Sequence, residues 1–306
     1  MEWGCHMNRR QFIKSAVIVG AAISAPPYLD PFLTHVLGAE IPDLVVAQGP
    51  SPSLITRAAI DGLGGIRKFV SRGDVVVVKP NIGWDRTPEY AANTNPEVVA
   101  AIVRLCREAG ASKVKVFDNP VNDARRTYKQ SGIADAAKSA GAVVSYIDDR
   151  KFKDMRINGL VLKSWPLYTE VFEADKIINV PIAKTHGLTD LTLGMKNWMG
   201  IMGGWRGRIH LRIDKSLVDL AMTVKPVLTV LDAVRILTAN GPAGGNLADV
   251  KILNTVIAGI DPVAVDAFGA TLFSRKPADL GYVRIGHEVG LGKMDLGRMN
   301  IKRIRL

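Results

Sequence analysis

Residues 74–81 read Asp-Val-Val-Val-Val-Lys-Pro-Asn, and the rest of this 306-residue sequence can be interpreted outward from them. Four consecutive valines are typical of a strand that is buried on both faces, as in the parallel sheets of α/β proteins. A strand that only fills a core does not need Lys79 and Asn81 at its carboxyl end. The stretch therefore predicts a buried parallel strand that delivers polar side chains to one edge of a sheet.

Strands and helices alternate on both sides of this run, which predicts an α/β fold with a mostly parallel, doubly wound sheet. Asn95 and Pro96 have the pattern of a helix cap and first turn, and that helix should end at Gly110. Residues 151–169 alternate more and contain Asn158-Gly159, which indicates an inserted β-hairpin. The remaining expected elements are strands at 44–47, 113–120, 142–149, 175–184, 227–234 and 253–260, and helices at 54–70, capped by Ser53, and from about 121 to 140.

The amino end differs in character from the rest of the chain. Residues 7–25 place Arg9 and Arg10 before a short apolar run, which resembles a twin-arginine export signal. We therefore expect residues 1–39 to be a signal peptide or anchor and residues 40–306 to be a single α/β domain. The export machinery would be a partner, the folded protein would be periplasmic or otherwise extracytoplasmic, and an uncleaved signal would keep it at the membrane. The alternative is a basic amphipathic start with no such role.

Charge and cysteine content narrow the possible partners. The formal net charge is +11, to which residues 1–39 add one net positive charge, so the exported part should favour anionic ligands. Nucleic acid is not expected as a partner, because the predicted location is extracytoplasmic. Cys5 and Cys106 are the only cysteines, so an iron–sulfur cluster held by four thiolates is not expected. Cys106 has the pattern of a buried helix residue.

Polar residues fall where several predicted strands end. They are Lys79 and Asn81, Asp118 and Asn119, Lys184 and His186, and Asp232. Ligands of open α/β sheets bind beyond the carboxyl ends of the strands, so these residues predict a shared cleft there. The alternative is that each is a turn former or a helix cap.

The sequence from Asn179 to Leu211 adds further candidates. If residues 189–202 form a helix, at about 100° per residue, Thr189, Thr192, Lys196 and Gly200 lie on one stripe opposite an apolar arc. Two hydroxyls, an ammonium group and a glycine suit a phosphate or carboxylate, although a solvated face is the alternative. The glycine-rich residues 203–208 have the pattern of a mobile loop that can cover a site.

Histidines supply the remaining candidate chemistry. His186 and His210 each lie beside a glycine-rich turn, and with Asp232 or Asp266 they would make a two-histidine, one-carboxylate site for a divalent metal. Without a metal, the same histidines would act as acid and base near pH 7. The sequence has no phosphate loop, no dinucleotide fingerprint and no nucleophile elbow.

Taken together, several segments resemble the family catalogued as domain of unknown function 362. They are KPNIG at 79–83, NVPIAKTH at 179–186, LTLGMKNWMG at 191–200, His210, LDAV at 231–234, NGP at 240–242 and DPVAVDA at 261–267. The resemblance spans about residues 75–273 and implies an α/β domain, sometimes joined to an iron–sulfur module that is missing here. The positions carried over are Lys79, Asn81, Lys184, His186, Lys196, Asn197, His210, Asp232 and Asp266.

We therefore expect an anion-binding cleft, able to hold a metal, that acts on a small anionic substrate. The catalytic candidates are His186, His210 and Lys184, the ligand-binding ones are Lys79, Asn81, Thr192, Lys196 and Asn197, and the metal ligands are His186, His210, Asp232 and Asp266. One alternative is a periplasmic protein that binds a ligand, or matures a cofactor, without chemistry. Another is a scaffold at the cell envelope that works through its basic surface.

Overall fold

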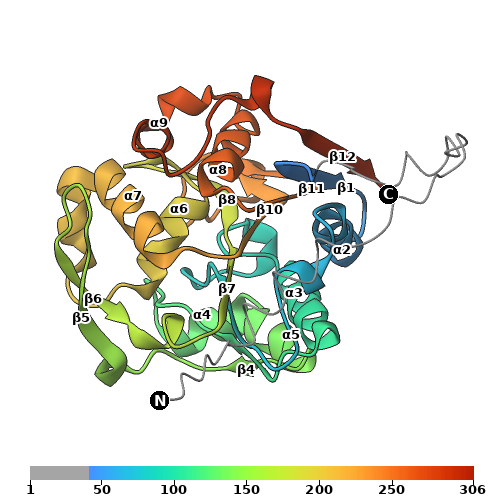
Figure 1. Ribbon diagram of the computed structural model, residues 1–306, viewed down its shortest axis with the longest axis horizontal. Helices are drawn as coiled ribbons and strands as arrows, with labels where there is room; N and C mark the ends of the chain where they lie inside the picture. Colours follow the sequence, from blue (N-terminus) through green and yellow to red (C-terminus); the bar gives the residue numbers. More distant parts are fainter. Residues whose placement is uncertain (1–40) are drawn as a thin grey trace, which may run out of the picture. The chain divides into compact units, whose positions relative to one another are not determined.

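The valine run forms strand β2 (Val75–Pro80), which lies within the parallel part of a ten-stranded sheet (Figure 1). The computed structural model describes residues 41–306, so the predicted export signal lies outside the described residues. Residues 41–306 pack together as one unit. None of the helices among them has the length and apolar character needed to cross a membrane.

The sheet is mostly parallel, as the sequence predicted. Its strand order is β12-β1-β11-β10-β7-β2-β3-β4, and neighbours from β10 to β4 all run parallel. Strand β11 is antiparallel to both β1 and β10. The bounds are β1 (Leu44–Gln48), β3 (Lys113–Val116), β4 (Val143–Val144), β7 (Lys176–Val180), β10 (Leu228–Leu237), β11 (Val250–Gly259) and β12 (Ile301–Arg305).

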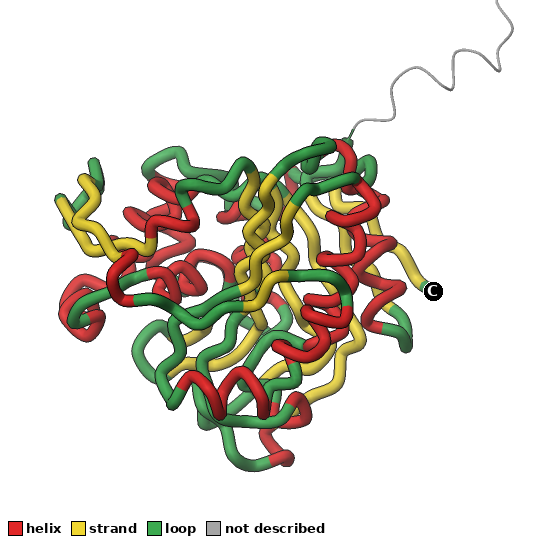
Figure 2. The backbone as a smooth tube through the Cα atoms, turned by 90° about the horizontal axis from the view of Figure 1, so that it is seen from below, coloured by secondary structure: helices red, strands yellow, loops and turns green. Residues whose placement is uncertain are grey.

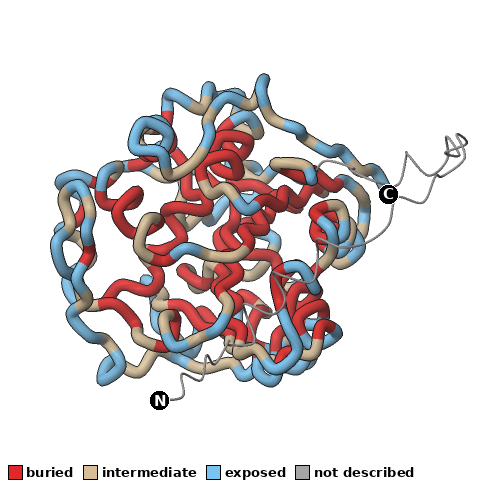
Figure 3. Tube along the Cα trace, viewed as in Figure 1, coloured by how far each residue is buried: buried red, intermediate tan, exposed pale blue. Residues whose placement is uncertain are grey.

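Helices cover both faces of this sheet, so the doubly wound prediction is confirmed (Figure 2). Val76 and Val78 pack into one core and Val77 into the other, because successive side chains of a strand point to opposite faces. The buried strands occupy the interior in Figure 3. One face carries α2 (Pro52–Gly62), α3 (Pro96–Ala109) and α5 (Ile133–Ser139), and the other carries α6 (Gly194–Asn197), α7 (Ile213–Val224), α8 (Pro262–Thr271) and α9 (Gly281–Glu288).

Capping residues set the helix limits. Helix α3 begins after Asn95, whose side chain accepts from the Glu97 amide, and ends at Gly110 with φ 95°, as predicted. Helix α2 is capped by Ser51, not by Ser53, and it ends at Gly62, where the glycine-rich segment replaces the predicted continuation to Val70. The helix predicted to reach Ala140 is divided into α4 (Ala124–Gln130) and α5, because Gly132 adopts φ 69°.

The inserted hairpin is present as β5 (Phe152–Arg156) paired antiparallel with β6 (Ser164–Tyr168), beside α7 in Figure 1. Its turn is longer than the two-residue turn that Asn158-Gly159 suggested. The Asp219 carboxylate accepts hydrogen bonds from the amides of Leu160, Val161 and Leu162, and so it holds the turn against helix α7.

The predicted helix at residues 189–202 is wrong for its first half. Residues up to Thr192 form strand β9 (Asp190–Thr192), which pairs antiparallel with β8 (Ile182–His186). Helix α6 then starts at Gly194, and a 3-10 helix, Trp198–Ile201, follows it. Hydrogen bonding to β8 satisfies the backbone at Lys184 and His186 and overrides the helical pattern. Thr189 consequently turns away, and its hydroxyl donates to the Leu191 carbonyl.

Candidate functional site

A cavity of about 330 Å³ lies at the carboxyl ends of β2, β3 and β8. Each of these strands contributes polar side chains from its end, and α6 with the following 3-10 helix closes the other side. The structure places eight of the ten predicted site residues around this cavity: Lys79, Asn81, Lys184, His186, Thr192, Lys196, Asn197 and His210. Cavities of similar size near Arg86 and Arg126 contain none of these residues.

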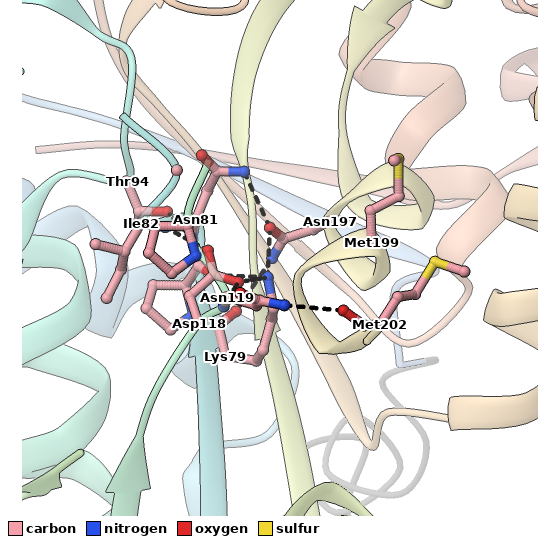
Figure 4. A network of polar contacts seen from close by, with 12 residues as sticks. Lys79, Asn81, Ile82, Thr94, Asp118, Asn119, Asn197, Met199 and Met202 are labelled. Atoms are coloured by element: carbon pink, nitrogen blue, oxygen red, sulfur yellow. Dashed lines mark hydrogen bonds and ion pairs between the residues drawn. The ribbon is translucent and has the colours of Figure 1, made fainter. Parts of the chain in front are cut away.

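An ion pair between Lys79 and Asp118 forms the floor of the cavity (Figure 4). Lys79 Nζ lies 2.8 Å from Asp118 Oδ1 and donates to Asn197 Oδ1 at 3.0 Å. Asp118 Oδ2 also accepts from the Ile82 amide at 2.6 Å. Both side chains are almost completely buried, and a buried pair is tolerated only when hydrogen bonds satisfy its remaining polar atoms. Lys79 is therefore already neutralised by the protein itself.

Lys184 is buried within β8 and has no carboxylate partner among residues 41–306. Its ammonium group donates to Asn81 Oδ1 at 3.1 Å and to the Ala92 carbonyl. Burial lowers the pKa of Lys184 to about 7, opposed by the charge of Asp118 and assisted by those of Lys196 and Lys79. Lys184 therefore changes charge near neutral pH.

Lys196 projects from α6, and its ammonium group has weaker hydrogen-bond partners than that of Lys184. Within the described part of the chain, its Nζ atom has only the Met199 sulfur as a hydrogen-bond acceptor, at 3.2 Å. Burial, followed by the charge of Arg206, lowers the pKa of Lys196 to about 8. The Thr192 hydroxyl, which lines the same cavity, is buried and has no hydrogen-bond partner among the described residues. An unpaired buried hydroxyl and an underpaired buried ammonium group are both costly, so both groups are suited to a ligand that can accept hydrogen bonds.

Arg206 belongs to the segment that was predicted to be a mobile loop, and it was missing from the predicted site. It lies in the 3-10 helix Arg206–Arg212, where its guanidinium group donates to the carbonyls of Asn119, Met199 and Pro120. These bonds fasten the segment over the cavity, and no carboxylate in residues 41–306 pairs with the charge. Asp118 was expected at the cleft from its position at a strand end, but it was not among the predicted catalytic, ligand-binding or metal residues.

His186 faces the cavity as a neutral ring. Burial and the charges of Lys196 and Lys184 lower its pKa to about 3. Its Nδ1 atom accepts a hydrogen bond from the Leu188 amide at 3.1 Å, so the ring proton of the neutral form lies on Nε2. His210 is exposed at the rim, and its pKa is also lowered, first by desolvation and then by Lys196. In this arrangement His186 offers an N–H donor rather than a proton that exchanges near pH 7.

Asp232 and Asp266 do not join the histidines. Asp232 accepts from the amides of Asn95 and Val234, and Asp266 accepts from those of Gly194 and Met195. Burial raises the pKa of Asp232 to about 6 and that of Asp266 to about 7. Within residues 41–306 no three histidine, cysteine or acidic side chains gather in a metal-binding cluster. The predicted metal ligands are therefore not brought together, because both carboxylates hold backbone amides instead.

The chain is similar to known proteins in sequence and in structure. A family model described as "Domain of unknown function (DUF362)" matches residues 76–271. The thylakoid-associated protein sll1697 of Synechocystis sp. (strain ATCC 27184 / PCC 6803 / Kazusa) is 30% identical over 246 residues, covering 77% of this chain and 74% of that protein. The lactate racemase apoprotein from Thermoanaerobacterium thermosaccharolyticum is similar in structure, with a TM-score of 0.46 and 11% identity. That likeness covers 74% of this chain and only 56% of the racemase chain.

Proposed function

The chain belongs to the DUF362 family, and we propose that it binds a small anion, a phosphate or a carboxylate, in the cleft lined by Lys184, Lys196 and Arg206. The observation that carries this proposal is the charge imbalance of the cavity. Asp118 neutralises Lys79, and no acidic side chain in the described part of the chain pairs with the other cations. Burying unpaired charge is unfavourable, and a bound anion would offset that cost.

The hydrogen-bonding groups support the same ligand class. Lys196 and the Thr192 hydroxyl both line the cavity and lack strong hydrogen-bond partners within residues 41–306. The Nε2–H of His186 adds a neutral donor. Donors of this kind suit the oxygens of a phosphate or carboxylate, which accept several hydrogen bonds at once.

The direct test is titration calorimetry with inorganic phosphate and with acetate at pH 6.5, where Lys184 and Lys196 are protonated. Lys196→Met should weaken binding roughly 10- to 100-fold, because a hydrogen bond to a charged group contributes about 1.5–3 kcal/mol. Lys138→Met is the matched control, since this exposed lysine ends α5 at the opposite, amino-terminal edge of the sheet. An affinity that is equal in the parent and the Lys196 variant would contradict the proposal.

We also propose that Lys184 transfers protons during chemistry on the bound anion. An amine whose pKa is about 7 can give and accept a proton at physiological pH. His186, with a pKa of about 3, would orient the ligand instead. A protein that binds without chemistry, as in ligand storage or cofactor maturation, would use the same contacts.

The two functions differ in the fate of the ligand. Ligand extracted from the purified parent and from Lys184→Met can be identified by mass spectrometry. A precursor that accumulates only in the variant indicates an enzyme, whereas the same compound in both indicates a binding protein. Metal content measured on the same samples and on a His186→Ala, His210→Ala double variant tests the divalent metal, whose loss in the double variant would assign it to the histidines.

Export remains a separate proposal, based on Arg9 and Arg10 in the segment outside the described residues. The basic net charge and the folded α/β domain are compatible with twin-arginine transport. Replacing both arginines by lysine should leave the protein in the cytoplasm of fractionated cells. Unchanged fractionation would count against this address, and membrane-bound parent protein would indicate an uncleaved signal.

A further inference from the structure

We propose that the anion bound in this cleft carries an apolar body, so that the ligand is an amphiphilic acid. The inference rests on the proposed anion site and names the class of ligand that fills it. Two chemically distinct groups of side chains line the cavity: the cations Lys184, Lys196 and Arg206, and a set of apolar side chains. A bare phosphate would contact only the cations.

The apolar wall is formed by side chains that would otherwise remain in contact with water. Leu188 and Val121 both line the cavity and are 62% and 60% exposed, respectively. Met199 and Pro242 also line the cavity, and we call these four side chains the apolar wall. Single exposed apolar residues are common on protein surfaces, but several that converge on one cavity mark a binding surface.

Further exposed apolar side chains lie on the segment that carries Arg206, which we call the rim. Trp205, directly before the 3-10 helix, is 76% exposed, and Leu211 within it is 90% exposed. The same short segment supplies Arg206 and His210 to the cavity. One element thus presents a cation to the head of a ligand and large apolar side chains to whatever extends out of the cavity.

The size of the cavity also exceeds what a small inorganic anion needs. Its volume is about 330 Å³. Since one water occupies about 30 Å³ of liquid, such a space holds roughly ten non-hydrogen atoms. An acid head with a short chain or a ring fills it, and the wall residues then lose contact with water.

Such a ligand could come from two sources that share this chemistry. A soluble alkyl or aryl acid would bind entirely within the cavity and against its wall. A membrane lipid would place its anionic group among the cations of the cavity while Trp205 and Leu211 contact the bilayer. Aromatic and aliphatic side chains beside arginines are typical of membrane-surface segments.

The test is a homologous series of acids titrated into the protein: acetate, butyrate, hexanoate and octanoate, with inorganic phosphate alongside. If the wall binds the apolar body, the dissociation constant should fall roughly two- to fourfold per added methylene until the cavity is filled. Leu188→Asn should flatten this dependence. Leu54→Asn should not, because Leu54 is similarly exposed, at 58%, on helix α2 and does not line the cavity.

The outcomes separate this inference from the anion site itself. Phosphate binding with equal affinities for acetate and octanoate would overturn the amphiphilic ligand and leave the anion site standing. A failure of every anion, phosphate included, would overturn both. A dependence on chain length that Leu188→Asn does not reduce would also contradict the assigned wall.

Vesicles distinguish the two sources. A blue shift of tryptophan fluorescence with phosphatidylglycerol vesicles, absent with phosphatidylcholine and lost in Trp205→Phe, would assign the ligand to the membrane. Chain-length dependence without any vesicle response would assign it to a soluble acid. Vesicle binding that persists unchanged in both Trp205→Phe and Leu188→Asn would overturn the role of this rim.

Discussion

Gly200 allows the 3-10 helix after α6 to approach the ion pair on the cavity floor. A Cβ atom at this position would clash with Asp118 Oδ1 and with Lys79 Nζ. The sequence placed Gly200 on a stripe that was expected to face a phosphate or carboxylate. In the structure, the space beside Gly200 is occupied by the buried ion pair.

Gly200→Ala should therefore lower the free energy of unfolding by about 3 kcal/mol, the range seen when a buried ion pair is broken. Urea denaturation followed by circular dichroism measures this loss. Gly187→Ala is the control, because nothing lies within 4 Å of a Cβ built there. Equal unfolding midpoints for the two variants would show that the floor adapts to the added methyl group.

The residues around the cavity differ in how far the sequence alone could predict their positions. Lys79, Lys184 and His186 could be placed near one another because carboxyl ends of parallel strands share an edge of the sheet. Thr192 and Lys196 line the same cavity, as the predicted helical stripe suggested. Thr192 nevertheless belongs to strand β9 and only Lys196 to helix α6. Arg206 could not be placed, since its position depends on carbonyl groups from distant parts of the chain.

Helix α6 has only four residues and depends on contacts outside itself. The Asp266 carboxylate accepts from the first two amides of the helix, at 2.6 and 2.9 Å, and thereby fixes the element that carries Lys196. A role for Asp266 at a metal was expected from the sequence. Its position on buried helix α8, against α6, explains why it supports the site from behind.

Asp266→Ala should destabilise the protein by about 2–3 kcal/mol, because it leaves buried amides unpaired, and it should also weaken phosphate binding through Lys196. Asp219→Ala is a matched control: Asp219 is equally buried and holds the amides of the β5–β6 turn. Thermal unfolding and calorimetry separate the two effects. Phosphate affinity that falls equally in both variants would indicate a general loss of folding, not a supporting role for α6.

The sequence correctly predicted helices and strands whose ends are set by nearby residues, such as a capping side chain or a glycine. Helix α3 follows from its Asn95 cap and Gly110 stop. The break between α4 and α5, and the replacement of half a helix by β9, depend on pairing and packing partners that are distant in sequence. Strand β11 was recognised as a strand, but its antiparallel direction follows from the path of the whole chain.

For the molecule as a whole, the buried lysines link stability to pH. In the folded protein the pKa of Lys184 is about 7 and that of Lys196 about 8, whereas an unfolded lysine has a pKa of about 10.4. Below pH 7 both states are protonated, and the full penalty of burying the charges is present. Between pH 7 and about 10 the unfolded state binds more protons, so stability rises with pH.

The ligand-free protein should therefore gain roughly 3–4 kcal/mol of unfolding free energy from pH 7 to pH 9, measured by urea denaturation. Lys184→Met should remove much of this gain, while Lys138→Met should keep it. Anion binding has the opposite dependence, because the ligand requires the protonated lysines: phosphate affinity should fall above pH 8, with proton uptake detectable by calorimetry in buffers of different ionisation enthalpy. Stability that decreases over this range in the parent would show that the lysines remain charged within the fold, held by groups other than a bound anion.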